Sequence, residues 1–155
     1  MAKRSGSGRR RAPGRKQKDT NISAKSKPVV SIIDDDQSCR EAIAGLMHWL
    51  GLSVQTFGSA VEFLSSPDVA GNSCIITDVQ MPQMTGIELH KRLTELGHAI
   101  PTILITAYPD EAARDRTLAD GIVCYLSKPF DNDALIECVR SALRVGSTGS
   151  TLTEL

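Results

Sequence analysis

The chain has 155 residues, of which 41% are hydrophobic and 23% charged, an ordinary composition for a globular domain with its own core. No apolar run approaches the roughly 20 residues of a membrane span, and no apolar segment follows the basic N-terminus as in a secretory signal. We therefore expect a cytoplasmic protein without a membrane partner. The net charge of zero is unevenly divided, because residues 1–28 carry +9 and the remainder −9.

Residues 1–28 are rich in Gly, Ser, Arg and Lys, and Ile22 is their one sizeable aliphatic residue. Such a segment cannot bury enough apolar surface to offset its ordering entropy, so we predict a disordered basic tail. Its run Arg9-Arg10-Arg11 could contact nucleic acid or another anionic surface. A solubilising tail, or one that folds back on the acidic domain, is the alternative.

From residue 29 onward, short apolar runs rich in β-branched residues alternate with segments of helical spacing. The run VVSII at 29–33, for example, predicts a buried strand, and the apolar positions of 38–50 predict a helix that ends before Gly51. In chain order, we predict a strand at 29–33, a helix at 38–50, a strand at 53–57, a helix from Ser59, a strand at 74–77, a helix at 85–96, a strand at 102–106, a helix at 110–119, a strand at 122–126 and a helix at 131–143.

This alternation, with near-continuous apolar strands, predicts an α/β fold: a doubly wound parallel sheet of five strands with helices on both faces. The domain is expected to cover residues 29–144, and residues 145–155 a flexible C-terminal tail. The four cysteines are far apart, and none forms a C-x-x-C pair. We therefore expect reduced, structural cysteines in a reducing compartment.

Polar residues follow the carboxyl ends of four predicted strands, where open parallel sheets gather their chemistry. They are Asp34, Asp35 and Asp36 after the first strand, Asp78 after the third, Thr106 ending the fourth and Lys128 after the fifth. Each has an ordinary explanation when taken alone, such as a helix cap or a turn residue. Their coincidence at four strand ends predicts one site.

Converging carboxylates repel one another unless a cation joins them, and hard oxygen ligands without His or Cys favour Mg²⁺. An aspartate held beside Mg²⁺ and a lysine stays ionised and can attack phosphorus, while the two cations stabilise charge on the transferring phosphoryl oxygens. The hydroxyl of Thr106 could donate a hydrogen bond to the product. The residues therefore predict an aspartyl-phosphate site.

Four motifs carry a resemblance to a known family. They are IIDDD at 32–36, DVQMPQMTG at 78–86, ITA at 105–107 and SKPF at 127–130. In order and spacing they resemble the receiver domain of bacterial two-component response regulators, over about residues 29–144. The resemblance implies a flavodoxin-like fold with five helices and the strand order 2-1-3-4-5.

By resemblance, Asp78 is the phosphoacceptor, and Asp34 with Asp35 forms the acidic pair that holds Mg²⁺. Asp35 would bind the metal directly and Asp34 mainly through water. Gln80 matches the position whose backbone carbonyl coordinates the metal, with Asp78 as a further ligand. Lys128 matches the lysine that pairs with the phosphoryl group.

The resemblance also implies a conformational switch. Thr106 matches the switch hydroxyl, Tyr125 the aromatic residue whose ring turns inward when the threonine moves, and Lys128-Pro129 a cis peptide bond. The implied partners are a sensor histidine kinase or phosphotransfer protein, and a downstream protein or an output domain missing from this chain. A phosphorylation-dependent dimer is a further expectation. The chain would act as a signalling protein with self-catalysed phosphoryl transfer and slow autodephosphorylation, rather than as an enzyme.

Two other classes of function share parts of this pattern. Phosphatases of the haloacid dehalogenase type also use an aspartate nucleophile after a strand, with a second aspartate two residues later. That position is Gln80, which lacks the acid/base carboxylate. The other alternative is a phosphorylation-independent binding module, whose basic tail would contact nucleic acid.

Overall fold

The computed structural model describes residues 27–152, with side chains described as far as residue 145. Most of the predicted basic tail lies outside the described residues. The elements are β1 (Val29–Ile33), α1 (Gln37–Trp49), β2 (Ser53–Phe57), α2 (Ala60–Leu64), the 3₁₀ turn η3 (Val69–Gly71), β3 (Cys74–Asp78), α3 (Gly86–Glu95), β4 (Thr102–Thr106), α4 (Glu111–Ala119), β5 (Cys124–Ser127) and α5 (Asn132–Leu152).

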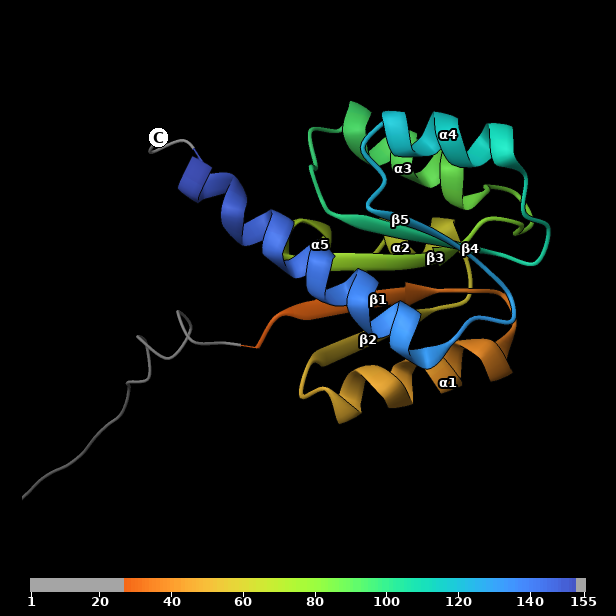
Figure 1. Ribbon diagram of the computed structural model, residues 1–155, viewed down its shortest axis with the longest axis horizontal. Coiled ribbons are helices and arrows are strands. Elements are labelled where there is room, and N and C mark those ends of the chain that lie inside the picture. The colour runs from red at the N-terminus through yellow and green to blue at the C-terminus, as the bar shows by residue number, and fades with distance from the viewer. Residues whose placement is uncertain (1–26, 153–155) are drawn as a thin grey trace, which may run out of the picture.

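The five strands form one sheet in the order β2-β1-β3-β4-β5, and all neighbours are parallel, as predicted (Figure 1). The central strands are buried on both faces, since every residue of β3 and β4 is buried. That burial explains their unbroken apolar sequences. The edge strand β2 is partly exposed, and its sequence accordingly mixes polar with apolar residues.

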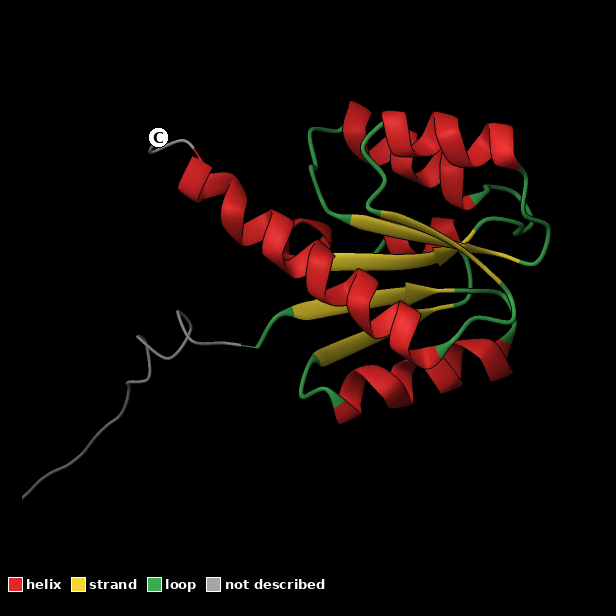
Figure 2. Cartoon of the chain, in the orientation of Figure 1, coloured by secondary structure: helices red, strands yellow, loops and turns green. Residues whose placement is uncertain are grey.

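Helices cover both faces of the sheet (Figure 2). On one face, α1 and α5 pack on β1, β3 and β4 through a single apolar cluster that includes Ile32, Met47 and Leu135. On the other face, α2 and α3 pack on β1 and β3 around Phe63, while α4 packs beside Leu104 and Tyr125. The two layers leave the carboxyl edge of the sheet free to carry polar groups.

Two helix starts explain how the carboxyl edge is shaped. Asp36 caps α1 by accepting hydrogen bonds from the backbone N–H groups of Ser38 and Cys39. Thr85 caps α3 in a capping box with Glu88. Both helices therefore begin in the loops that follow β1 and β3, the strands whose carboxyl ends present Asp34 and Asp78.

The last helix is longer than predicted. The predicted end at Leu143 is wrong, because α5 continues to Leu152. Gly146 and Gly149 suggested a break, but a glycine weakens a helix by only about 1 kcal/mol relative to alanine and, unlike proline, does not remove a backbone donor. The assignment of a flexible tail from residue 145 remains a prediction.

The expectation of four reduced cysteines was also wrong. Cys124 of β5 and Cys138 of α5 form a disulfide, while Cys39 and Cys74 are free. The spacing of 14 residues between the two cysteines does not predict this disulfide, because it is the packing of α5 across the sheet that brings Cys138 next to Cys124. Within the described residues, no helix is long and apolar enough to cross a membrane.

Candidate functional site

Three carboxylates converge at the carboxyl ends of β1 and β3. These strands are paired, with Ile33 opposite Thr77, so Asp34 and Asp78 leave neighbouring strands at the same edge. Carboxylate oxygens of Asp34, Asp35 and Asp78 lie within 4.8 Å of one another. Asp34 is 2% and Asp78 7% exposed, whereas Asp35 is open to solvent. The predicted acidic residues are thus brought together.

Lys128 completes this cluster from beyond β5. Its Nζ lies 3.2 Å from Asp34 Oδ2 and 3.4 Å from Asp78 Oδ1. The backbone N–H of Lys128 donates to the carbonyl of Thr106 at 2.7 Å, and the bond to Pro129 is cis, as predicted. Burial alone would lower the pKa of Lys128, but its hydrogen bond to Asp34 and the two nearby carboxylates outweigh that effect and raise the pKa. The ammonium therefore stays protonated.

One ammonium does not balance three carboxylates. Burial and the neighbouring carboxylate of Asp34 raise the pKa of Asp78 to about 6, although Lys128 opposes the shift. The donors are all hard oxygens, and one of them is solvent-exposed. Such a set fits a small divalent cation that keeps part of its water shell. The structure thus provides an acidic cluster that could bind a metal ion.

The backbone around Asp34 is fixed by contacts that the sequence did not single out. The N–H of Asp36 donates to Asp34 Oδ1 at 2.9 Å, and the Arg40 guanidinium donates to the Asp34 carbonyl at 2.6 Å. Arg40 lies one helical turn beyond the cap of α1. The sequence therefore indicates where Arg40 lies, but not that it donates a hydrogen bond to the Asp34 carbonyl. These bonds set the direction in which the Asp34 carboxylate points.

Gly86 packs directly against the backbone of Asp78. Its N–H donates to the carbonyl of Val79 at 3.0 Å, and a Cβ at this position would overlap the Asp78 carbonyl oxygen and lie 3.1 Å from Thr77 Cγ2. Only glycine allows α3 to begin this close to β3. The start of α3 therefore supports the aspartate at the end of β3.

Thr106 reaches the site, but its hydroxyl is engaged elsewhere. Thr106 Oγ1 donates to Gln80 Oε1 at 2.7 Å and accepts from the N–H of Tyr108 at 2.9 Å. Sequence reasoning gave Gln80 a role through its backbone carbonyl only. The side-chain bond was missed, because no sequence pattern specifies which way an exposed glutamine folds over a loop.

Tyr125 connects β5 to α4. The ring is buried beside Leu104 and Ile122, and its hydroxyl accepts from the N–H of Asp110, the N-cap of α4, at 3.2 Å. Arg114 of α4 donates to the Tyr125 carbonyl at 3.3 Å. A pocket of about 590 Å³ lies over this contact, lined by Pro109, Asp110, Glu111, Arg114, Tyr125 and Ser127.

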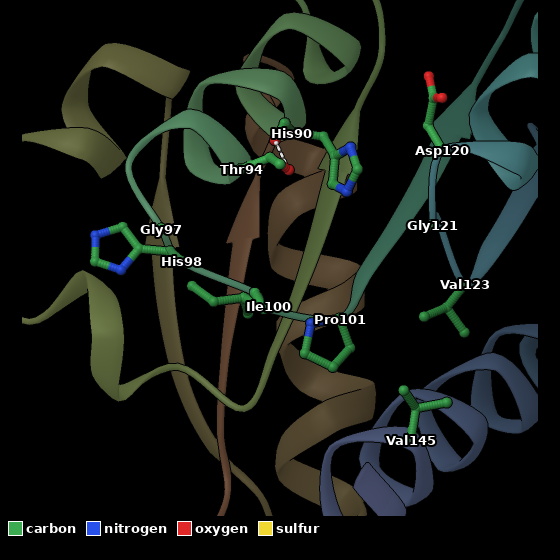
Figure 3. A pocket seen from close by; sticks show the side chains of 11 residues that line it. His90, Thr94, Gly97, His98, Ile100, Pro101, Asp120, Gly121, Val123 and Val145 are labelled. Carbon is green, nitrogen blue, oxygen red and sulfur yellow. Dashed lines mark hydrogen bonds between the residues drawn. The ribbon is translucent and has the colours of Figure 1, made fainter.

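A second pocket, of about 420 Å³, lies at the amino ends of β4 and β5, away from the carboxyl edge that carries the aspartates. Figure 3 shows the side chains that line it. His90 and Asp120 line it, together with Pro101 and Val123 near the starts of β4 and β5. The imidazole of His98 lies apart from that of His90 (Figure 3). Asp34, Asp35 and Asp78 do not line this pocket, so it is separate from the carboxylate cluster.

The geometry and the four motifs agree with a single family. A model described as the response regulator receiver domain matches residues 30–140. The chain belongs to the response regulator receiver family. The observed strand order is that of the receiver fold, and the chain is accordingly a receiver domain of two-component signal transduction.

Relatives of this receiver domain are regulators. The response regulator protein TodT of Pseudomonas putida is 37% identical over 76% of this chain and 52% of its own length. The transcriptional regulatory protein FixJ of Azorhizobium caulinodans is 38% identical over 74% of this chain and 54% of its own. A response regulator receiver protein from Burkholderia phymatum has a solved structure that is 41% identical, with a TM-score of 0.65, over 76% of this chain and 95% of that one. The chain spans about half the length of TodT and FixJ.

Proposed function

We propose that this receiver domain accepts a phosphoryl group on Asp78 from a sensor histidine kinase or phosphotransfer protein. The observation that carries the proposal is the position of the Asp78 carboxylate, which is buried, grouped with two other carboxylates and 3.4 Å from the Lys128 ammonium. A carboxylate in this setting has few water competitors and a fixed cation beside it. These are the requirements of a nucleophile toward phosphorus.

In the proposed reaction, an Asp78 oxygen forms a bond to phosphorus as the bond between phosphorus and the donor imidazole nitrogen breaks. The bonding pair leaves with the imidazole, and Lys128 faces the negative charge that arrives with the phosphoryl oxygens. Asp34, Asp35, Asp78 and the backbone carbonyl of Gln80 would hold the metal ion, which we take to be Mg²⁺. When bound, Mg²⁺ would neutralise the carboxylates and polarise the phosphoryl oxygens. Slow self-catalysed hydrolysis would reset the site.

Phosphorylation would then act through Thr106. Its hydroxyl bonds Gln80 in the structure, and a phosphoryl group on Asp78 offers a charged acceptor instead. Movement of Thr106 would alter the packing of Tyr125, whose hydroxyl and carbonyl both contact α4. The face formed by α4, β5 and α5 would change its affinity for partners as the population of the two states shifts.

We also propose what the face formed by α4, β5 and α5 acts on. Since the chain spans about half the length of its relatives, the face would act on an output domain or a separate downstream protein in the cytoplasm. Phosphorylation-dependent dimerisation through the same face is a further part of the proposal. The domain limits are taken as residues 29–144.

The test is intact-mass spectrometry of the full chain after incubation with acetyl phosphate, with and without Mg²⁺. We expect a Mg²⁺-dependent phosphoryl adduct that is lost in base and absent from Asp78→Asn. Asp36→Asn is the matched control, because Asp36 lies beside the cluster but caps α1, and asparagine caps equally well. Normal labelling of Asp78→Asn would refute the assignment.

A further inference from the structure

The disulfide between Cys124 and Cys138 joins two elements of the face that the proposed switch moves. The Cα atoms are 6.0 Å apart, inside the usual range of about 4.4–6.8 Å for a disulfide. Cys124 lies in β5, and Cys138 is 7% exposed in α5, which runs across one face of the sheet (Figure 1). The covalent bond therefore fixes the distance between β5 and α5.

Consecutive residues of β5 connect to opposite layers. Tyr125 packs in the cluster on the α4 side, whereas its neighbour Cys124 packs in the cluster on the α5 side. Tyr125 is tied to α4 by two hydrogen bonds, and Cys124 is tied to α5 by the disulfide. Any displacement of β5 that accompanies a change at Tyr125 must therefore act on the disulfide.

We propose that Cys124 and Cys138 form a redox control of the receiver, in which the disulfide opposes the phosphorylated conformation and the dithiol permits it. The proposal rests on the proposed function. In the proposed cytoplasmic location, disulfides are usually transient and either catalytic or redox-sensing. A cross-link between two elements of the switching face fits redox sensing.

The reaction is thiol–disulfide exchange with a dithiol reductant. A reductant thiolate bonds to the sulfur of Cys124, the more exposed of the two residues, and Cys138 leaves with the bonding pair and takes up a proton. The second thiol of the reductant then attacks the mixed disulfide and releases Cys124 as a thiol. The reductant becomes a disulfide and supplies both electrons. A small disulfide such as oxidised glutathione drives the reverse reaction.

Reciprocal coupling gives the test. The full chain is equilibrated in glutathione buffers of graded ratio, with Mg²⁺ and either beryllium fluoride, a phosphoryl mimic, or fluoride alone. The thiols are then alkylated, and the bond is quantified by peptide mass spectrometry, which separates Cys124 and Cys138 from Cys39 and Cys74. We expect the mimic to shift the equilibrium constant for glutathione reduction of the Cys124–Cys138 disulfide roughly fivefold toward the dithiol. By reciprocity, forming the disulfide should weaken binding of the mimic by the same factor.

Three variants define the outcome. Cys138→Ala should make binding of the mimic independent of the buffer ratio, Cys74→Ala should leave the fivefold shift intact, and Asp78→Asn should abolish it. An equilibrium that is the same with and without the mimic, or no disulfide at any ratio, would overturn the redox control while acetyl phosphate labelling persists. If labelling and mimic binding both fail, the proposed function falls and the control of the switch falls with it, although the exchange of the two cysteines remains measurable.

Discussion

Asp78 is ionised at a free-energy cost when no metal is bound. Its pKa is raised to about 6 from the ordinary 3.8, so the folded protein binds more protons than the unfolded chain between these values. The free energy of unfolding must therefore fall as pH rises from about 4 to about 6, and be unaffected by this group outside that window. The loss amounts to at most about 3 kcal/mol, because one pKa unit corresponds to about 1.4 kcal/mol.

The first prediction concerns this cost. Without metal, Asp78→Asn should be more stable than the parent at pH 7 by about 1–3 kcal/mol, since asparagine removes a buried charge and Lys128 keeps its partner Asp34. Below pH 4 the difference should vanish, because Asp78 is then protonated. Urea unfolding of both proteins in EDTA across pH 3–8 measures the difference in their free energies of unfolding. The contributions of the other acidic residues are common to both proteins and cancel in this difference. A difference that does not vary with pH would contradict the assigned burial and charge.

The second prediction concerns the bond that occupies Thr106. Gln80→Met keeps the backbone carbonyl but removes the Oε1 acceptor, so the hydroxyl should be free to bond a phosphoryl group. A net hydrogen bond of about 0.5–1.5 kcal/mol corresponds to a roughly 2–10-fold gain in affinity for beryllium fluoride with Mg²⁺. Fluorine NMR titration measures it. Gln55→Met, on the exposed edge strand β2, is the control and should leave the affinity unchanged.

At the scale of elements, the start of α3 is held against β3 with no room for a side chain. The third prediction follows from this contact. Gly86→Ala should lower the free energy of unfolding by about 2 kcal/mol or more and slow labelling of Asp78, because the new Cβ must displace the Asp78 carbonyl. Gly45→Ala in α1 should instead be neutral or stabilising by up to about 1 kcal/mol, since its Cβ meets nothing within 4 Å. Equal effects of the two variants in thermal unfolding would refute this reading.

The elements also show which parts of the structure the sequence can predict. The strands β1, β2 and β4 lie where their apolar runs predicted, and Asp34, Asp78 and Lys128 meet because parallel strands share one edge. The end of α5 and the disulfide were not predictable from local pattern. A helix can continue through two glycines, and a cysteine pair depends on packing between segments. The bond from Thr106 to Gln80 depends on a side-chain rotamer, which sequence does not specify.

For the molecule as a whole, the carboxylates and Lys128 join segments that follow the central strand β3 and strands on either side of it. Asp34 follows β1, Asp78 ends β3 and Lys128 follows β5. A cation bound there would therefore strengthen the entire fold. The fourth prediction is that Mg²⁺ raises the free energy of unfolding at pH 7 by about 2.7 kcal/mol at 100 times its Kd, and that EDTA reverses the gain. Asp35→Asn should weaken this response, and an equal response in that variant would argue against the cluster as the site.

The strand order β2-β1-β3-β4-β5 has a consequence for how the protein can be assembled during synthesis. β2 pairs with β1, β3 takes the other side of β1, and β4 and β5 then add outward in turn. Every new strand finds a free edge on a strand that has already left the ribosome, and none must be inserted between two that are already paired. At roughly 5–20 residues per second, the sheet can grow in step with translation, one strand every few seconds.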